Sequence, residues 1–507
     1  MDSPVSEFYC DKNVFITGVT GFLAKSVVEK LLRRTNVNKI YVLIREKKGK
    51  SINERMDDIK RNPVFDRLKQ EKGDSILYKV VPIAGDMGMT NLNLSEADRT
   101  LLMENVDVVI HSAATLDFEL NAKLVININL MGTKRVLSLC SQMQRLRAFV
   151  YVSTAYVNSD KSFALEKLYP KPGKVDDFIS ILKLNDEDAD KTLQKLINGH
   201  INSYTVSKAL AEHEVSYCST TFPTAIVRPS MIVGAWQEPS PGWTDSKNGP
   251  NGFFMGAELG IVRRLPVNKD LVYDYIPVDI VTNELIVAAW KVGTERSSET
   301  RIFHCTSSIA KPFSWKTLEP KINHMLVNYP LKSAVWYPTL KLHSNFTLFR
   351  ISTLFLHFLP GILFDILLKL QGRRPMLVKM HYKVDSSLCR LAPFIFKEWF
   401  FDSSNTEKLH ESLTETDRID YNLDIRQINY EKFFEDAVRG VRRYLNKEPD
   451  ETLTAARRKV KVFYVLNHLA QFLFLFLIWL TFATITRLTL TSSAWFVLPA
   501  YVLFSFL

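Results

Sequence analysis

The sequence of 507 residues predicts an α/β protein: a doubly wound parallel sheet, then a smaller, mostly helical domain, then a hydrophobic C-terminal anchor. Short apolar runs rich in β-branched residues alternate with segments long enough for helices, which is typical of a parallel sheet covered on both faces. Polar, helix-like sequence follows, and uncharged stretches close the chain. We expect domains at 10–345 and 346–448 and the anchor at 462–507. The expected strands are Asn13–Thr17, Ile40–Ile44, Lys79–Ala84, Val106–His111, Phe149–Val152 and Ala225–Val227.

Composition limits the class of protein. Apolar residues make up 46% and charged residues 23%, an ordinary globular balance that excludes a wholly disordered, collagenous or polytopic membrane chain. The net charge of +11 favours anionic partners such as phosphorylated cofactors or acidic lipid headgroups, and we expect no nucleic-acid partner. The five cysteines are dispersed without a C-x-x-C pair, which indicates reduced thiols in a cytosol-facing protein.

The first expected strand leads into a glycine-containing turn. The sequence VFITGVTGFLA places Gly18, Gly21 and Ala24 at three-residue intervals where a helix begins. Gly18 permits a tight turn, Gly21 lets the backbone approach a pyrophosphate, and Ala24 allows close packing of helix on strand. The helix N-terminus adds free N–H groups and partial positive charge. An ordinary strand-to-helix turn is the alternative, but the position on the first strand favours a Rossmann-type dinucleotide site.

The tips of the next two strands refine the expected cofactor. Arg45, followed by Lys47 and Lys48, stands where an NAD site usually carries an acidic residue. A guanidinium there can hold a 2′-phosphate, so NADPH is favoured over NADH, with a solvated basic loop as the alternative. Asp86 follows the third strand, where it could accept a hydrogen bond from the adenine amine.

The fourth strand ends in a histidine followed by small residues. Ser112 and Ala113 leave room for the cofactor, so we assign them to its site. We interpret His111 as a packed, hydrogen-bonded residue rather than as a catalyst. The ten histidines show no metal-ligand spacing beside cysteines or carboxylates, so we predict no metal.

A hydroxyl-bearing strand end and a Y-x-x-x-K helix carry the expected chemistry. The fifth strand runs into Ser153 and Thr154, and Tyr204 and Lys208 follow within a helical pattern. Because residues at i and i+4 share a helix face, we expect Lys208 beside Tyr204, lowering the pKa of the phenol. A hydroxyl from Thr154, or alternatively Ser153, completes a donor pair for a substrate carbonyl. Y-x-x-x-K is common by chance, and only its place after the nucleotide turn makes it functional.

The C-terminus predicts a membrane anchor. From Val462 to Thr486 there is no Asp, Glu, Lys or Arg, and about 20 residues suffice to cross a bilayer core. The second uncharged stretch, Leu488–Leu507, contains Thr, Ser and Pro, so one pass, two passes and a re-entrant segment all remain open. A buried hairpin in a soluble core is the alternative. Basic residues upstream keep the preceding domain on the cytosolic side: Arg457, Arg458, Lys459 and Lys461.

One earlier segment, Phe346–Lys369, is apolar but interrupted by Arg350, His357, Pro360 and Asp365. These interruptions favour amphipathic helices that touch a membrane or an acyl chain over a true span. Simple packing onto the preceding domain is about equally plausible.

Assembled, these motifs resemble an extended short-chain dehydrogenase/reductase and, more narrowly, the insect-type alcohol-forming fatty acyl-CoA reductases. The matching segments are TGVTGFLAKSVVEKLLR, YVSTAYVNSD, YTVSKALAE, VRPSMIVGAWQEPSPGWTDSKNGPNG, YDYIPVDIVTN and HFLPGILFDILLKLQGRRPMLVKMHYKV. The resemblance assigns catalysis to Tyr204, Lys208 and Thr154. Ala24 stands where most members carry a third glycine, a change we consider neutral. The cofactor residues that it implies are Gly18, Thr20, Gly21, Phe22, Leu23, Lys208 and Pro229.

The resemblance implies a four-electron, NADPH-dependent reduction of a long-chain fatty acyl-CoA to a primary fatty alcohol through an enzyme-held aldehyde. It also implies contact with membrane lipid at the endoplasmic reticulum or the peroxisome, and leaves a homodimer open. Two rivals remain: a membrane-tethered sterol or sugar-nucleotide dehydrogenase/epimerase of the same fold, and a non-catalytic nucleotide-binding scaffold.

Overall fold

The computed structural model describes residues 3–47, 49–116, 121–197 and 199–506. The chain forms two compact units whose segments interleave along the sequence. We call them the sheet unit (Met1–Ser246, Val272–Phe313 and Glu398–Phe433) and the helical unit (Lys247–Leu271, Ser314–Lys397 and Phe434–Leu507).

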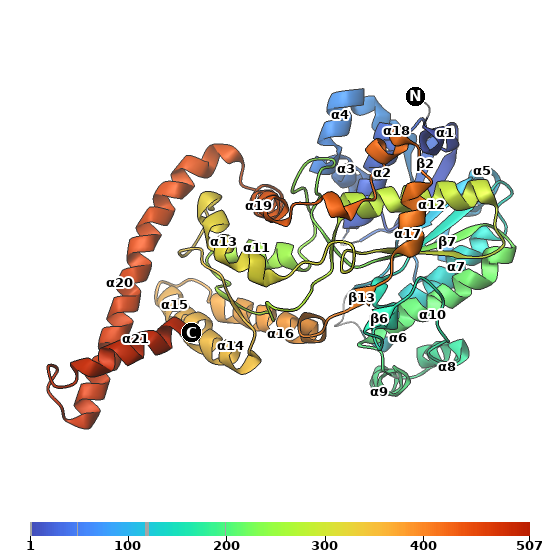
Figure 1. The fold of residues 1–507 in the computed structure, drawn as a ribbon. Helices are drawn as coiled ribbons and strands as arrows, with labels where there is room; N and C mark the ends of the chain where they lie inside the picture. Colours follow the sequence, from blue (N-terminus) through green and yellow to red (C-terminus); the bar gives the residue numbers. More distant parts are fainter. Residues whose placement is uncertain (1–2, 48, 117–120, 198, 507) are drawn as a thin grey trace. The chain divides into compact units, whose positions relative to one another are not determined.

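The sheet unit contains a seven-stranded parallel sheet (Figure 1). Its order, β11-β7-β5-β4-β1-β2-β3, shows that the chain runs outward from β1 to β3 and then returns to place β4 on the other side of β1. At such a reversal, ligands bind outside the carboxyl ends of the strands. The strands are β1 (Asn13–Thr17), β2 (Lys39–Ile44), β3 (Val80–Ala84), β4 (Val108–His111), β5 (Ala148–Val152), β7 (Thr224–Pro229) and β11 (Arg301–Cys305).

The predicted fold class is confirmed, and a strand forms at each expected place. The edge strand β11 was not predicted. Its sequence, RIFHC, carries a histidine among apolar residues, and His304 is buried with both ring nitrogens within hydrogen-bond distance of a partner. Its Nδ1 lies 2.6 Å from the Asp402 carbonyl and its Nε2 lies 3.1 Å from Arg228.

Helices cover both faces of the sheet (Figure 1). On one face α2 (Phe22–Arg34) packs against α12 (Val278–Glu295), and on the other α7 (Gly132–Cys140) packs against α10 (Ser203–Tyr217). The core beneath α7 and α10 includes Phe15, Phe149, Tyr151, Val136, Val206 and Leu210. The unit also contains α1 (Pro4–Phe8), α3 (Ile52–Lys60), α4 (Asp66–Lys72), α5 (Glu96–Asn105), α6 (Ala122–Val125), α8 (Val175–Ser180), α9 (Asp186–Leu196), α17 (Ser404–Glu411) and α18 (Glu415–Asp420), with the strand pairs β8–β10 (Met231–Val233, Tyr275–Pro277) and β6–β13 (Phe163–Ala164, Phe400–Phe401).

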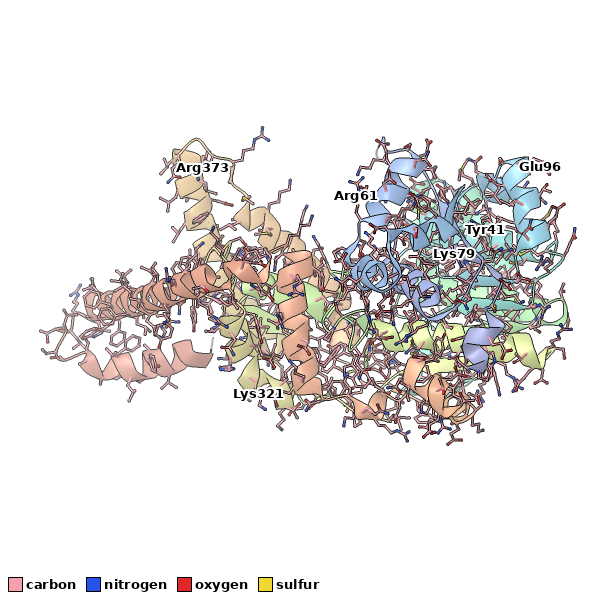
Figure 2. The ribbon with its side chains drawn as sticks, turned by 90° about the horizontal axis from the view of Figure 1, so that it is seen from above. Tyr41, Arg61, Lys79, Glu96, Lys321 and Arg373 are labelled. Atoms are coloured by element: carbon pink, nitrogen blue, oxygen red, sulfur yellow. The ribbon has the colours of Figure 1, made fainter. Side chains whose placement is uncertain are left out.

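The helical unit carries the apolar helices. In Figure 2, Arg373 lies at the tip of the hairpin formed by α15 and α16. The helices are α11 (Pro250–Glu258), α13 (Trp315–Asn328), α14 (Phe346–Thr353), α15 (Leu359–Leu370), α16 (Leu377–Ile395), α20 (Leu453–Thr486) and α21 (Val497–Phe506), with α19 (Tyr430–Gly440) at the boundary with the sheet unit. One two-stranded sheet joins β9 (Arg264–Pro266) to β12 (Lys341–His343).

The segment from α14 to α15 carries two buried polar side chains and a largely exposed row of apolar ones. His357 and Asp365 are buried, and Asp365 accepts the backbone N–H groups of Met376, Leu377 and Val378 at the start of α16. Leu363, Leu367 and other apolar side chains are exposed. Two of the predicted interruptions, His357 and Asp365, therefore hold the segment in the unit, whereas Arg350 and Pro360 are exposed.

Two helical stretches in the described residues are long and apolar enough to cross a membrane, Phe346–Leu370 and Asp450–Thr486. The second contains the first part of the predicted anchor, Val462–Thr486. After Arg487 the chain turns back, and Phe496 stacks on Phe482 with ring centroids 3.9 Å apart. Helix α21 follows with ten described residues, about 15 Å of helix.

Candidate active site

The turn after β1 has the geometry expected of a pyrophosphate cradle. Gly18 has φ +83°, and a Cβ on it would lie 2.9 Å from the Ala113 backbone nitrogen, so only glycine fits. The Gly21 N–H donates to the Gly18 carbonyl at 2.8 Å, and Gly21 caps α2. Leu23 and Ala24 are buried against the sheet, so Leu23 can offer a ligand only its backbone.

Beyond β4 the predicted small residues lie directly against this turn. The Ala113 N–H donates to Thr17 Oγ1 at 3.1 Å, and Ser112 also borders the Cβ position of Gly18. Pro229 ends β7 at the same carboxyl edge of the sheet. Thr20 is exposed within the turn.

His111 is a packed residue, as interpreted from the sequence. Its Nδ1 lies 2.7 Å from Thr17 Oγ1 and its Nε2 lies 3.0 Å from Thr133 Oγ1. Thr133 donates its proton to the Asn129 carbonyl, so Nε2–H donates to Thr133 and Nδ1 accepts from Thr17. Burial lowers the pKa of His111 to about 3, so it stays neutral.

Arg45 and Asp86 meet at the carboxyl ends of β2 and β3. Arg45 Nη1 lies 3.3 Å from Asp86 Oδ2, and both side chains are partly exposed. Asp86 Oδ1 accepts the Gly88 N–H at 2.8 Å, which fixes the carboxylate. The backbone of Lys47 bridges to that of Lys50, and Lys48 lies outside the described residues. The groups predicted for the adenine and the 2′-phosphate thus form one partly exposed patch.

Tyr204 and Thr154 are hydrogen-bonded to each other. Tyr204 lies in the first turn of α10, whose N-cap Asn202 forms a capping box with Thr205. Thr154 follows β5, and its hydroxyl also accepts the Tyr156 N–H at 3.4 Å. The adjacent Ser153 hydroxyl is buried without a hydrogen-bond partner. The structure therefore pairs Tyr204 with Thr154, the first of the two predicted hydroxyls.

Lys208 is deeply buried one turn further along α10. Its Nζ donates to the Val152 carbonyl at 2.6 Å and lies 4.2 Å from the centroid of the Tyr151 ring. Burial lowers the pKa of Lys208 to about 7, and the negative charge of Glu212 partly opposes this shift.

The net pKa shift of Tyr204 is opposite to the lowering expected from Lys208. Burial raises the pKa of the Tyr204 phenol above its ordinary value, and the hydrogen bond with Thr154 offsets part of that rise. Sequence spacing places the two side chains on one helix face, but it cannot show how strongly both are withdrawn from water. Desolvation of the phenol outweighs any stabilisation by a lysine that donates to Val152.

Two groups near the site were missed by sequence reasoning. Tyr151 presents its ring face to the Lys208 ammonium, and its position two residues before Ser153, on the same face of β5, was the available signal. Asn129, on the π-helical turn before α7, donates to Ser207 Oγ at 3.1 Å, between Tyr204 and Lys208 along α10.

The Pro- and Trp-rich loop before Ser246 is fixed to α2. Trp243 is fully buried, and its ring centroid lies 5.0 Å from that of Phe22. Glu238 pairs with Lys30 and with Arg33, and Asp279 accepts backbone N–H groups of the loop. The loop therefore holds the helix whose N-terminus forms the cradle. In the part of the chain that the structure describes, no cluster of three or more His, Cys, Asp or Glu could hold a metal ion.

Comparison with known proteins agrees with this architecture. Two family models described as male sterility protein match the chain, an NAD-binding one over residues 16–285 and one named Sterile over residues 356–448. The Drosophila melanogaster protein CG8306, named as a candidate fatty acyl-CoA reductase, is 46% identical over 100% of this chain and 99% of its own length. Fatty acyl-CoA reductase 1 of Xenopus laevis is 33% identical over 97% of this chain and 95% of its own.

Solved structures support the fold. The terminal reductase domain of the myxalamid biosynthetic pathway aligns with a TM-score of 0.56 at 19% identity, covering 85% of this chain and 90% of its own. The reductase domain of a Mycobacterium tuberculosis peptide synthetase aligns with a TM-score of 0.55 at 16% identity, covering 86% and 94%. The family matches and the extent of the identity show that this chain belongs to the fatty acyl-CoA reductases, oxidoreductases built on an NAD(P)-binding domain.

Proposed function

We propose that the protein reduces long-chain fatty acyl-CoA to a primary fatty alcohol and coenzyme A, using two NADPH in two steps at one site. The observation that carries the proposal is the Tyr204–Thr154 pair, with Lys208 one turn further along α10, after a strand of the sheet whose carboxyl edge also bears the Gly18 turn. A donor pair of this kind polarises a carbonyl.

The residues at the edge fit a dinucleotide. A Cβ at Gly18 would fill the space beside Ala113, so the turn keeps a cradle open for a pyrophosphate, and the N-terminus of α2 supplies free N–H groups. Arg45 would hold the 2′-phosphate of NADPH by exchanging part of its contact with Asp86. The bound nicotinamide would supply the hydride in each step.

The chain supplies proton transfer and charge stabilisation. Because burial raises the pKa of Tyr204, its phenol stays protonated near neutral pH and can donate to the carbonyl oxygen. Thr154 stabilises the developing oxyanion beside it. The hemithioacetal formed from the thioester then collapses to coenzyme A and an aldehyde, and the same pair donates to the aldehyde oxygen in the second step. No thiol is needed.

The apolar segments of the helical unit match a substrate and a product that partition into lipid. Each buried CH₂ contributes about 0.8 kcal/mol, so long acyl chains stay at the membrane. We propose that α20 anchors the protein and that the basic residues before Val462 keep the sheet unit in the cytosol, at the endoplasmic reticulum or the peroxisome. A homodimer remains a prediction.

The test uses the full chain with palmitoyl-CoA and NADPH, with alcohol measured by mass spectrometry. We expect two NADPH consumed for each alcohol formed. Tyr204→Phe should lower turnover by about 10²- to 10⁴-fold and leave NADPH affinity unchanged. A hydroxysterol with NAD serves as the control for the rival dehydrogenase. Turnover retained by the variant would remove Tyr204 from catalysis, and no product from any acyl-CoA would favour a scaffold.

A further inference from the structure

Two adjacent arginines stand at the start of β9 in the helical unit. β9 pairs in parallel with β12, which brings Lys341 opposite Arg264. The Lys341 backbone N–H donates to the Arg263 carbonyl at 3.0 Å. Three cationic residues therefore meet at the beginning of one short sheet.

Neutral groups hold Arg263. Its Nη2 donates to Asn467 Oδ1 at 3.1 Å, and its backbone N–H donates to His357 Nε2 at 3.0 Å. Its Nε is buried, and none of the described residues forms a hydrogen bond with it. Among the described residues no carboxylate forms an ion pair with Arg263, and burial lowers its pKa to about 10.

Arg264 places a second charge beside the first. Its Nη1 donates to the Arg263 carbonyl at 2.8 Å, and burial, followed by the charge of Arg263, lowers the pKa of Arg264 to about 9. Glu319, the acidic group that acts on Lys341, is itself paired with Lys269 at 2.7 Å. Because burying the Arg263 guanidinium without an ion pair from the described residues is costly, an anion bound here would be stabilised.

This basic edge lies where α20 leaves the body of the unit. Asn467 accepts from Arg263 and from the Trp336 indole at 2.9 Å, and it is only 5% exposed. After it, no side chain of α20 is buried until Ala483. Asn467 lies six positions after Lys461, the last charge before the apolar stretch, which is about 9 Å of helix. If α20 enters a bilayer there, Arg263 stands at the level of the headgroups.

We propose that Arg263 and Arg264, with Lys341, bind the phosphate group of an anionic phospholipid at the point where α20 enters the membrane. Guanidinium groups match phosphate oxygens through paired N–H donors, and basic pockets beside membrane helices bind acidic headgroups. The exposed apolar face of α15 in the same unit can contact the acyl chains. The phosphates of coenzyme A offer the same chemistry, so the experiment separates these two sources. The site does not depend on the reductase chemistry.

The first arm measures lipid retained by the full chain in native mass spectrometry from detergent micelles, with phosphatidic acid against phosphatidylcholine. We expect the wild type to retain one phosphatidic acid in preference. Arg263→Gln with Arg264→Gln should weaken this binding at least tenfold, while Arg263→Lys keeps part of it. Lys316→Gln, which removes an exposed charge of the same unit, should bind as the wild type does. Unchanged NADPH affinity and melting temperature show that the variants fold, and equal binding by the double variant overturns the proposal.

The second arm uses adenosine 3′,5′-bisphosphate, the phosphorylated nucleoside of coenzyme A. It should not displace the retained lipid, and the double variant should keep its KM for palmitoyl-CoA within about twofold. If the nucleotide displaces the lipid and the KM rises tenfold, the site belongs to the substrate and the lipid assignment is wrong. If the wild type shows no reductase activity, the proposed function fails. Lipid retention is measured separately, so that result would not decide the lipid site.

Discussion

Arg228 in the sheet unit and Arg263 in the helical unit are both withdrawn from water, but different groups face them. Arg228 Nε and Nη2 donate to the two carboxylate oxygens of Glu212 at 2.8 and 2.6 Å. Arg263 meets an amide oxygen and keeps a buried Nε without a hydrogen-bond partner. A neutralised buried charge completes a fold, whereas one surrounded by neutral groups marks a place where a ligand can add the missing charge.

Lys208 resembles Arg263 more than Arg228. Its ammonium meets a carbonyl oxygen and the Tyr151 ring, and the nearest acidic influence, Glu212, is already bound to Arg228. The candidate active site and the basic edge therefore share one property: a cation kept partly uncompensated. Four variants test whether this distinction between structural and ligand-binding cations holds.

The largest effect on stability is expected for the neutralised pair. Arg228→Met leaves the Glu212 carboxylate buried without its guanidinium, which typically costs about 3–5 kcal/mol. Thermal unfolding monitored by circular dichroism should show a clear drop in Tm. Replacing both partners, Arg228→Met with Glu212→Leu, should recover much of it. A single variant as stable as the wild type would abolish the distinction.

Lys208→Met should lower turnover about 10²-fold or more. It should change the free energy of unfolding only a little. Burial lowers the Lys208 pKa to about 7, against about 10.4 in an unfolded chain. Between these values the unfolded chain holds the proton and the folded chain does not, so the wild type gains stability as pH rises from about 7 to about 10. The wild-type Tm should therefore rise relative to that of the variant between about pH 7 and about pH 9. If the difference in Tm between the wild type and the variant instead falls over this range, the burial of the Lys208 ammonium is contradicted.

Arg45→Ala tests a cation that is paired but exposed. It should raise the KM for NADPH about tenfold, a loss of about 1.4 kcal/mol, while the KM for NADH changes little. Steady-state kinetics with both cofactors measure the ratio. Arg61→Ala, on the exposed end of α3, serves as a charge-matched control. Equal changes for the two cofactors would place Arg45 in an ordinary solvated loop.

The smallest effect is expected for the stability of Arg263→Gln. Because no carboxylate of the described residues is left unpaired by this change, the free energy of unfolding should fall by no more than about 1 kcal/mol, or rise. Chemical denaturation of the detergent-solubilised chain measures the difference. A loss as large as that of Arg228→Met would show that Arg263 serves the fold.

The sequence was sufficient for the sheet and for the turn. The strands that were predicted are apolar on both faces, and the Gly18 turn has a steric requirement that residue identity alone reveals. Thr154 and Tyr204 also meet as expected from their strand end and helix start. Edge strand β11 was missed because its buried His304, hydrogen-bonded at both ring nitrogens, interrupts the apolar pattern that marks the other strands.

Degree of burial was the property that sequence could not supply. It reverses the expected pKa shift of Tyr204, and it turns Arg263, an unremarkable basic residue in the sequence, into a guanidinium with a buried Nε. The sequence placed Tyr151 in a strand. Its contact with the Lys208 ammonium, however, depends on the distance between α10 and β5. Distances between elements decide such roles, and no local pattern encodes them.

The exposed apolar face of α15 has a practical consequence for anyone who shortens the chain. Cutting after Lys461 would delete the uncharged part of α20, yet Leu363, Leu367 and Leu370 would still be exposed. Since these side chains belong to the part that remains, the truncated enzyme would still expose an apolar surface. It would need detergent or lipid to stay in solution without aggregating.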